Sequence, residues 1–171
     1  MTIQRLTPAH ASAYRSLMLE AYDTRPVAFG TTSHEAAGFP MSWWETRTHD
    51  APDSTCLVMG VLDGDALMGA AGLLFEARER ACHRATLFGM YLRPVLRGAG
   101  LGRMLVTATL DAARSRPGVR VVQLSAIEGN EGALRLYEKC GFVRYGLEPM
   151  CFSSDGGWLS RVHMWRELEA R

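Results

Sequence analysis

Hydrophobic positions recur with a helical period near the start of the chain and with a strand period further on. Residues 2–6 predict a short strand, and Pro8 fits the first position of the helix that follows. The apolar residues that share one face of this helix are Tyr14, Leu17, Met18 and Ala21. Pro26 ends the helix, and residues 32–49 predict a second helix or two short ones.

From residue 54 the apolar period changes to two, which predicts an antiparallel meander. Segment 54–61 predicts a strand, 63–65 a hairpin turn and 66–77 the returning strand. A charged turn follows, and 83–92 predicts a third long strand. The period therefore places three neighbouring strands in the middle of the chain.

The second half of the chain alternates between helices and strands. A stripe of apolar residues at helical spacing follows the glycines near position 100: Leu101, Met104, Leu105, Ala108 and Ala112. Segment 119–126 is apolar and predicts a strand that is buried on both faces. Asn130 is a candidate N-cap for a short helix that Gly141 ends. Segments 142–152 and 158–168 predict a last hairpin.

This order of elements predicts one mixed α/β domain. A strand–helix–strand unit requires a parallel pair of strands, whereas the hairpins require antiparallel pairs. We therefore expect a mixed sheet with helices on both faces, and no linker or internal repeat divides the chain.

Composition narrows the class of partner and the compartment. The formal net charge is only +1 and 22% of the residues are charged, so neither nucleic acid nor a membrane surface is expected as the main partner. No apolar run is long enough to span a bilayer, and the start of the chain does not match a secretory signal. The cysteines stand in no metal-binding or redox spacing, so we expect a cytoplasmic protein without a metal.

The segment 96–106, "LRGAGLGRMLV", is the strongest candidate for chemistry. Glycines between a strand and a helix let the main chain approach an anion, which the N-terminus of the helix attracts. The P-loop pattern fails because no Lys-Ser or Lys-Thr pair follows. A dinucleotide-binding fingerprint fails because Leu105 occupies its third glycine position. A pyrophosphate site at an Arg-x-x-Gly-x-Gly loop, or a purely structural turn, is left.

Two segments in this order resemble the GNAT family of acyl-CoA-dependent N-acetyltransferases. The first, "MYLRPVLRGAGLGRMLV", is similar to the family's main coenzyme A motif of strand, proline-containing turn, glycine loop and helix. The second, "NEGALRLYEKCGF", is similar to its downstream signature. The resemblance covers residues 85–145 most strongly. It implies a single N-acetyltransferase domain over 1–171, with about seven mostly antiparallel strands that splay apart between the fourth and the fifth.

The resemblance also implies residue roles. The backbones of Met90 and Leu92 would bind the pantetheine arm and the acetyl carbonyl of acetyl-CoA, and Asn130 would contact the arm or act only as a helix cap. Tyr137 would protonate the departing thiolate, although its place on an apolar helix face also fits a core residue. The residues implied to contact the cofactor are Met90, Tyr91, Leu92, Arg97, Gly98, Ala99, Gly100, Leu101, Gly102, Arg103, Asn130 and Tyr137.

The general base is where the sequence departs from the family pattern. Family members that carry a glutamate or histidines before the glycine loop have them at the positions of Thr86 and Phe88. Strand alternation places His83 on the opposite face from Thr86. The other candidates, acting directly or through water, are Glu76, Glu128 and Glu148. An amine that is already deprotonated would need no base at all.

The acceptor is less defined than the cofactor. By resemblance, the segment after the first helix and the last hairpin wall the acceptor site, which suggests Phe29 and Tyr145 and, among further aromatic candidates, Trp43, Trp44 and Trp158. The absence of an acidic cluster favours a small primary amine over a polyamine or a basic peptide. A protein N-terminal or lysine acetyltransferase and a non-catalytic acyl-CoA-binding module are the alternatives. Dimers are common in the family, and no apolar stripe here decides whether this chain forms a homodimer.

Overall fold

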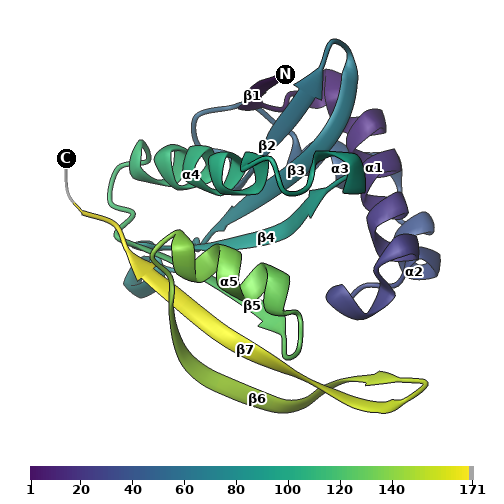
Figure 1. Ribbon diagram of the computed structural model, residues 1–171. Coiled ribbons are helices and arrows are strands. Elements are labelled where there is room, and N and C mark those ends of the chain that lie inside the picture. Colours follow the sequence, from purple (N-terminus) through teal and green to yellow (C-terminus); the bar gives the residue numbers. More distant parts are fainter. Residues whose placement is uncertain (170–171) are drawn as a thin grey trace.

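The computed structural model describes residues 1–169, and its centre is one seven-stranded sheet (Figure 1). The strands lie in the order β1-β2-β3-β4-β5-β7-β6. Every neighbouring pair is antiparallel except β4 and β5, which confirms the mixed, mostly antiparallel sheet. Residues 170–171, the end of the predicted domain, lie outside the described residues.

The elements follow the predicted order, with boundaries that differ by a few residues. The strands are β1 (Thr2–Arg5), β2 (Cys56–Asp63), β3 (Ala66–Phe75), β4 (Arg84–Leu92), β5 (Val121–Ile127), β6 (Val143–Ser154) and β7 (Gly157–Glu167). The helices are α1 (Ala11–Thr24), α2 (Ser33–Ala37), α3 (Met41–Arg47), α4 (Leu101–Arg114) and α5 (Glu131–Lys139). Two short helices form within 32–49 because Gly38 and Pro40 interrupt the chain between them.

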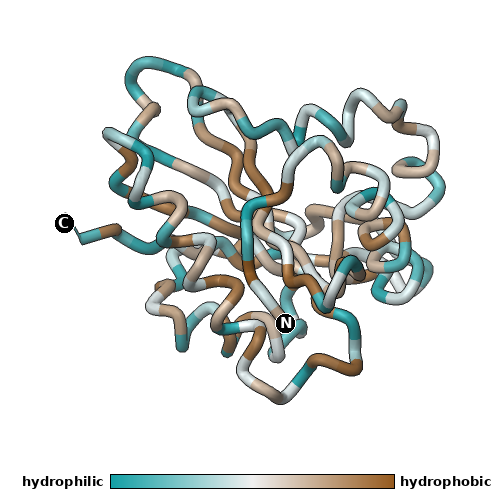
Figure 2. The backbone as a smooth tube through the Cα atoms, turned by 90° about the horizontal axis from the view of Figure 1, so that it is seen from above, coloured by the Kyte–Doolittle hydropathy of each residue, from teal (hydrophilic) through white to brown (hydrophobic). Residues whose placement is uncertain are grey.

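Helices cover both faces of the sheet, as predicted. Buried residues of α1 and α3 pack against one face of β2 and β3, with Tyr14 and Trp44 at the centre of that core. Buried residues of α4 and α5 pack against the other face, around Leu110 and Leu134. Figure 2 shows the hydrophobic positions concentrated along the central strands, while most of the loops are hydrophilic.

Strand β5 corrects one prediction, because its second face is only partly buried. Val122 and Leu124 lie in the core under α4 and α5, whereas on the opposite face Ile127 is buried but Ser125 is exposed. The helices of the other layer pack over β2, β3 and β4, and no residue of β5 belongs to their core. The apolar composition of the segment therefore did not reveal its open face.

The parallel pair at the centre of the sheet parts after a few residues. Strand β4 pairs with β5 only from Arg84 to Thr86, and the two strands separate beyond this point. On its other side, β4 has one extra residue relative to β3, at Gly89, whose φ of 60° is left-handed. This bulge turns β4 away from β5, and it confirms the predicted splay between the fourth and fifth strands.

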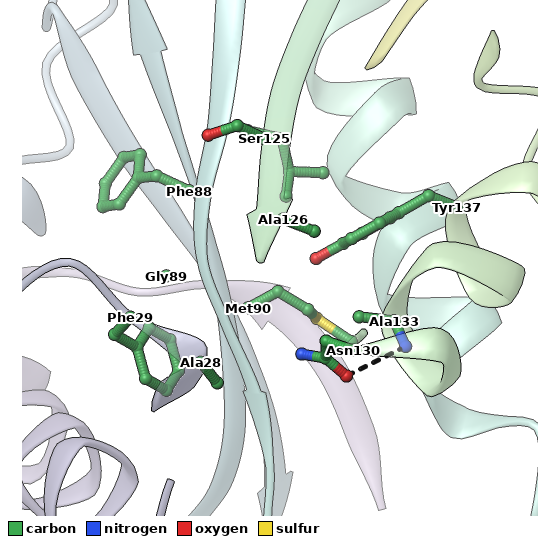
Figure 3. A pocket seen from close by; sticks show the side chains of 11 residues that line it. Ala28, Phe29, Phe88, Gly89, Met90, Ser125, Ala126, Asn130, Ala133 and Tyr137 are labelled. Atoms are coloured by element: carbon green, nitrogen blue, oxygen red, sulfur yellow. Dashed lines mark hydrogen bonds between the residues drawn. The ribbon is translucent and has the colours of Figure 1, made fainter. Parts of the chain in front are cut away.

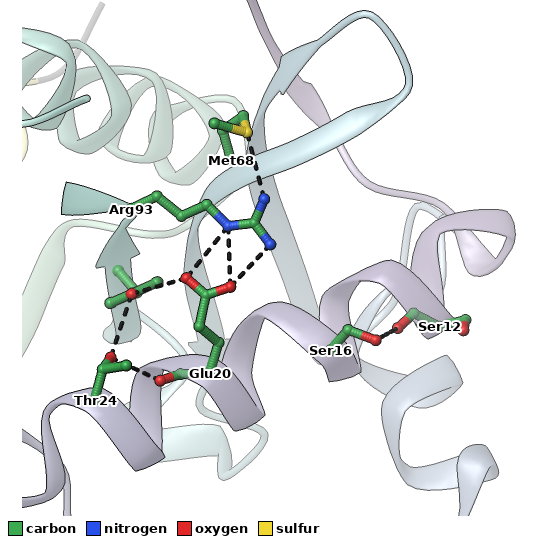
Figure 4. A network of polar contacts seen from close by, with 7 residues as sticks. Ser12, Ser16, Glu20, Thr24, Met68 and Arg93 are labelled. Atoms are coloured by element: carbon green, nitrogen blue, oxygen red, sulfur yellow. Dashed lines mark hydrogen bonds and ion pairs between the residues drawn. The ribbon is translucent and has the colours of Figure 1, made fainter. Parts of the chain in front are cut away.

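A polar network fixes α1 to the end of β4 (Figure 4). The Arg93 guanidinium donates through Nε to Glu20 Oε2 at 3.0 Å, and its Nη2 lies 2.8 Å from the same oxygen. The Tyr91 hydroxyl donates to Glu20 Oε1 at 3.1 Å. Because Arg93 directly follows β4, this charge-assisted network positions the turn that leads into the glycine loop.

Candidate functional site

A small pocket of about 90 Å³ lies where β4 and β5 separate (Figure 3). Its walls come from the turn after α1, from β4 and β5, and from the start of α5. The lining residues are Ala28, Phe29, Leu87, Phe88, Gly89, Met90, Ser125, Ala126, Asn130, Ala133 and Tyr137. The pocket therefore occupies the gap that missing strand pairing leaves in the sheet.

The pocket joins the two faces of the sheet. Tyr137 and Asn130 reach it from α5, on the face that α4 also covers. Phe29 and Phe88 lie on the other side of β4, as Figure 3 shows. A ligand that enters along α4 can thus meet a second ligand that enters from the side of Phe29.

Tyr137 is placed as a neutral hydrogen-bond donor. Its ring is buried and packs edge-on against Phe142, with 5.9 Å between ring centroids, while its hydroxyl points into the pocket (Figure 3). Burial, with a smaller contribution from Cys140, raises the pKa of Tyr137 well above its usual value. The hydroxyl consequently keeps its proton at neutral pH. Tyr137 is therefore part of the core through its ring and part of the pocket lining through its hydroxyl.

The Asn130 side chain caps α5 and also lines the pocket. Its Oδ1 accepts a bond from the Ala133 N–H at 3.4 Å and caps α5. Its side-chain nitrogen points toward Met90 inside the pocket (Figure 3). One amide can therefore cap the helix and still present a donor to a ligand.

The glycine loop has the geometry of an anion site. Gly98 and Gly100 have φ values of 83° and 79°, and a Cβ built on either would have no atom within 4 Å. The first intrahelical bond of α4 runs from Met104 N–H to the Gly100 carbonyl. The amides at the start of α4, in residues 101–103, accordingly have no partner in the helix and are free for an anion.

Gly102 has a packing role besides. A Cβ there would lie 3.3 Å from Leu136 Cδ2 and 3.5 Å from Leu92 Cδ1, so this glycine lets α4 approach α5 and β4 closely. Ala99 and Leu101 complete the loop, Ala99 exposed and Leu101 packed against the core beneath the helix. The loop therefore combines one structural glycine with two that leave open space.

The two arginines of the loop differ. The Arg97 side chain turns back and donates from Nε and Nη2 to the Leu92 carbonyl, at 3.2 and 3.0 Å, which fastens the loop to β4. The Arg103 side chain is exposed in the first turn of α4, and no ion pair within residues 1–169 involves it. Only Arg103 keeps its guanidinium available for a phosphate.

Next to the bulge at Gly89, the main chain of β4 faces the gap between β4 and β5. The Arg93 N–H bonds to the Met68 carbonyl of β3, so strand alternation turns the N–H of Leu92 away from β3. Met90 lines the pocket, whereas the Tyr91 side chain is buried on the α1 side of the sheet. Tyr91 can therefore contact a ligand in the pocket only through its backbone.

The aromatic residues proposed for the acceptor site differ in whether they line the pocket. Phe29 lines the pocket. Tyr145 lies outside its lining; its ring is 56% exposed and its hydroxyl donates to Gln123 Oε1 at 3.2 Å. Trp44 is fully buried in the core and Trp158 is exposed in the last hairpin, so neither walls the pocket.

The candidates for the general base also differ in their position and in their partners. Thr86 is exposed and offers no acid or imidazole. Glu76 lies near the closed end of β4, where hydrogen bonds from Arg78 lower the pKa of Glu76 to about 2. Glu128 lies outside the pocket lining. Glu148 is the one candidate that contacts a histidine.

Glu148 contacts His163, which sequence reasoning missed. Glu148 Oε2 lies 2.9 Å from His163 Nε2 and 2.6 Å from Arg161 Nε. The hydrogen bond from Arg161, and then that from His163, lowers the pKa of Glu148. His163 lies directly opposite Ser125 in the β5–β7 register, one strand from the pocket.

Comparison with known proteins identifies the family. The family model described as "Acetyltransferase (GNAT) family" matches residues 13–142, and the chain belongs to this family. Phosphinothricin N-acetyltransferase of Alcaligenes faecalis is 31% identical over 94 residues, which are 54% of this chain and 48% of that enzyme. The chain thus spans about half the length of that relative.

Two further similarities cover more of the chain. The L-amino acid N-acyltransferase MnaT of Escherichia coli is 29% identical over 133 residues, 77% of this chain and 73% of that protein. The structure of yncA, a putative acetyltransferase from Salmonella typhimurium with its cofactor acetyl-CoA, superimposes with a TM-score of 0.79. It is 22% identical and covers all of this chain and 95% of that one, which establishes the shared fold.

No helix in the range 1–169 is long and apolar enough to cross a membrane. In the same range, no group of three or more His, Cys, Asp or Glu side chains is placed to hold a metal ion.

The capping of α5 by Asn130 can be tested by substitution. Asn130→Ala removes the cap of α5 and should lower the free energy of unfolding by about 1 kcal/mol. Asn130→Asp keeps a capping oxygen beside the positive end of the helix and should retain the wild-type value. Urea unfolding followed by circular dichroism measures both. Equal losses in the two variants would contradict a capping role.

Proposed function

We propose that the protein transfers the acetyl group of acetyl-CoA directly to a primary amine of a small molecule, within a ternary complex. The observation that supports this most is the pocket between β4 and β5, which joins the side of the glycine loop to the side of Phe29. The named relatives act on phosphinothricin and on L-amino acids, which are small amines.

The residues present fit acetyl-CoA as the acyl donor. The open space at Gly98 and Gly100 and the free amides of α4 suit a pyrophosphate, and Arg103 adds an available charge. The backbone beside the bulge, at Met90 and Leu92, can bond the amide groups of an extended arm in the manner of an added strand. Acetyl-CoA supplies an acyl group that is already activated as a thioester.

The side chains and backbone of the split would assist the transfer by position and by hydrogen bonding. Backbone N–H groups at Met90 or Leu92 would stabilise negative charge that develops on the acyl oxygen. Tyr137 would donate a hydrogen bond to the departing sulfur. Because its pKa is raised, Tyr137 stabilises a thiolate by hydrogen bonding more readily than by giving up its proton completely. This direct route needs no cysteine or serine nucleophile.

A covered acceptor entrance favours a small molecule over a protein. The turn that contains Ala28 and Phe29 lines the pocket from the α1 side. Strand β6 reaches the same region, because a Cβ at Gly30 would lie 2.3 Å from Phe152 Cζ. A protein substrate would need an open groove here, whereas a small amine fits beneath this contact.

The anion site can be tested at one glycine with a matched control. Gly100→Leu should abolish binding of coenzyme A, because the side chain fills space that the pyrophosphate needs. Gly118 also has a left-handed φ, of 84°, and open space around it, but it lies beyond the far end of α4. Gly118→Leu should suffer similar backbone strain and bind normally. Titration calorimetry with coenzyme A measures both, and loss of binding in both variants would refute the proposed site.

The role of Tyr137 predicts a loss of turnover without a loss of binding. Tyr137→Phe removes the hydroxyl but keeps the buried ring, so kcat should fall at least about tenfold while the Kd for acetyl-CoA changes little. Thiol release across a panel of amines measures the rate. Unchanged kcat in the variant would exclude this role. A wild-type protein that binds acetyl-CoA but releases thiol with no amine would be a binding module instead.

A further inference from the structure

Arg47 is a cation without a counter-ion on the acceptor side of the pocket. Its guanidinium carbon lies 3.4 Å from the centroid of the Trp43 ring and 5.5 Å from that of Phe88, which lines the pocket. Within residues 1–169, no hydrogen bond or salt bridge that we find involves its guanidinium. Aromatic contacts hold this charge in place, while its donors stay free.

The surroundings of Arg47 are built to place it there. The ring of Phe88 lies against Gly72 of β3, where a Cβ would be only 2.3 Å from Phe88 Cζ. Tyr22 packs edge-on against the pocket residue Phe29, with 5.1 Å between centroids. The positive charge of Arg47 opposes the rise that burial causes in the pKa of Tyr22, so its field reaches this wall.

Two carboxylates on elements around the pocket, one on α1 and one on β6, already have cationic partners. Glu20 pairs with Arg93, and Glu148 pairs with Arg161. The Arg47 guanidinium, held by aromatic rings, is thus a cation with free donors on the Phe29 side of the pocket. A polyamine would meet repulsion there, whereas a carboxylate would find a fork of N–H donors that matches its own geometry.

We propose that Arg47 binds the carboxylate of the acceptor, so that the substrates are small amines that carry a carboxylate, as α-amino acids do. This inference rests on the proposed acetyl transfer and defines its substrate class. The planar guanidinium would bind the carboxylate on the side of Phe88 that faces Arg47. The amine would then extend past Phe88 and Phe29 into the pocket between β4 and β5.

Matched substrates test the role of Arg47. The wild-type protein should acetylate L-leucine with a higher kcat/KM than L-leucinamide or isoamylamine, which lack the carboxylate. Arg47→Gln should lower kcat/KM for L-leucine by about 10- to 100-fold, the range for loss of a hydrogen bond to a charged group, and leave the two analogues without a carboxylate within about twofold. The same comparison with L-methionine and L-phenylalanine covers other side chains.

Two variants control for folding and for general charge. Arg47→Lys keeps the cation and should retain part of the preference for carboxylates, while Arg120→Gln removes an exposed arginine elsewhere and should change nothing. Acetylation of amines without a carboxylate, spermidine included, in preference to all three amino acids would overturn the carboxylate site and leave acetyl transfer intact. Absence of thiol release with every amine would instead overturn the proposed function.

The acceptor amine must lose a proton during the transfer, and His163 of β7 is a candidate to accept it. A carboxylate only accepts hydrogen bonds, so in the neutral form of His163 the contact with Glu148 requires the hydrogen on Nε2 and leaves Nδ1 as the acceptor. In the β5–β7 ladder, Glu128 N–H bonds to the Ser160 carbonyl, so Ser125 and His163 form a non-hydrogen-bonded pair. Side chains approach most closely in such pairs.

We infer that His163 accepts the proton of the acceptor amine at Nδ1, directly or through one water, with Glu148 as its positioning residue. As the new N–C bond forms and the C–S bond breaks, the proton passes from the amine to the imidazole and then to solvent. The groups that face His163 are Glu148 and Tyr145 from β6, Arg161 from its own strand and Ser125 from β5.

The pH dependence of a variant distinguishes this role from a structural one. His163→Gln keeps a polar side chain beside Glu148 and should lower kcat/KM about 100-fold at pH 7, where the amine is protonated. The deficit should shrink as the pH approaches the pKa of the amine, because the neutral amine then needs no base. A deficit that stays constant from pH 7 to pH 10, or no deficit at all, would overturn the inference. Glu148→Gln should show a smaller deficit with the same trend.

Discussion

The failure of β4 and β5 to stay paired is the constraint on which the site depends. Two parallel strands normally satisfy each other's backbone groups along their whole length. Here the pairing stops at Thr86 and Gln123, and the bulge at Gly89 turns β4 aside. Unpaired donors and acceptors in the middle of a sheet are costly unless a ligand or water satisfies them. The same gap that weakens the sheet therefore provides both a place and a backbone for an extended ligand.

The elements around the gap hold it open from both sides. Arg97 fastens the glycine loop to the end of β4, and the pair of Glu20 and Arg93 fastens α1 to the same point. On the other side, β5 is held by its full pairing with β7. These attachments on the outer edges of both strands hold β4 and β5 apart where the pocket lies.

The sequence predicted local features well because they depend on neighbours in the chain. The glycine loop before α4, the cap at Asn130 and the alternation of strands all follow from residue type and short-range spacing. The open face of β5 was mispredicted, because burial depends on which helices pack over a strand. Likewise, His163 could be linked to Glu148 only once the register of the last hairpin was known.

The chain is nearly neutral overall, but it has two locally cationic regions on opposite sides of the sheet. Arg103 stands free beside the glycine loop, and Arg47 stands free beside Phe88 on the opposite side of the sheet. The net charge of +1 does not reveal them, because the 18 acidic residues of the chain offset all but one of its 19 basic residues. In the proposed reaction, Arg103 would recruit the pyrophosphate and Arg47 the carboxylate of the acceptor, while the side chains that line the pocket between them are all uncharged.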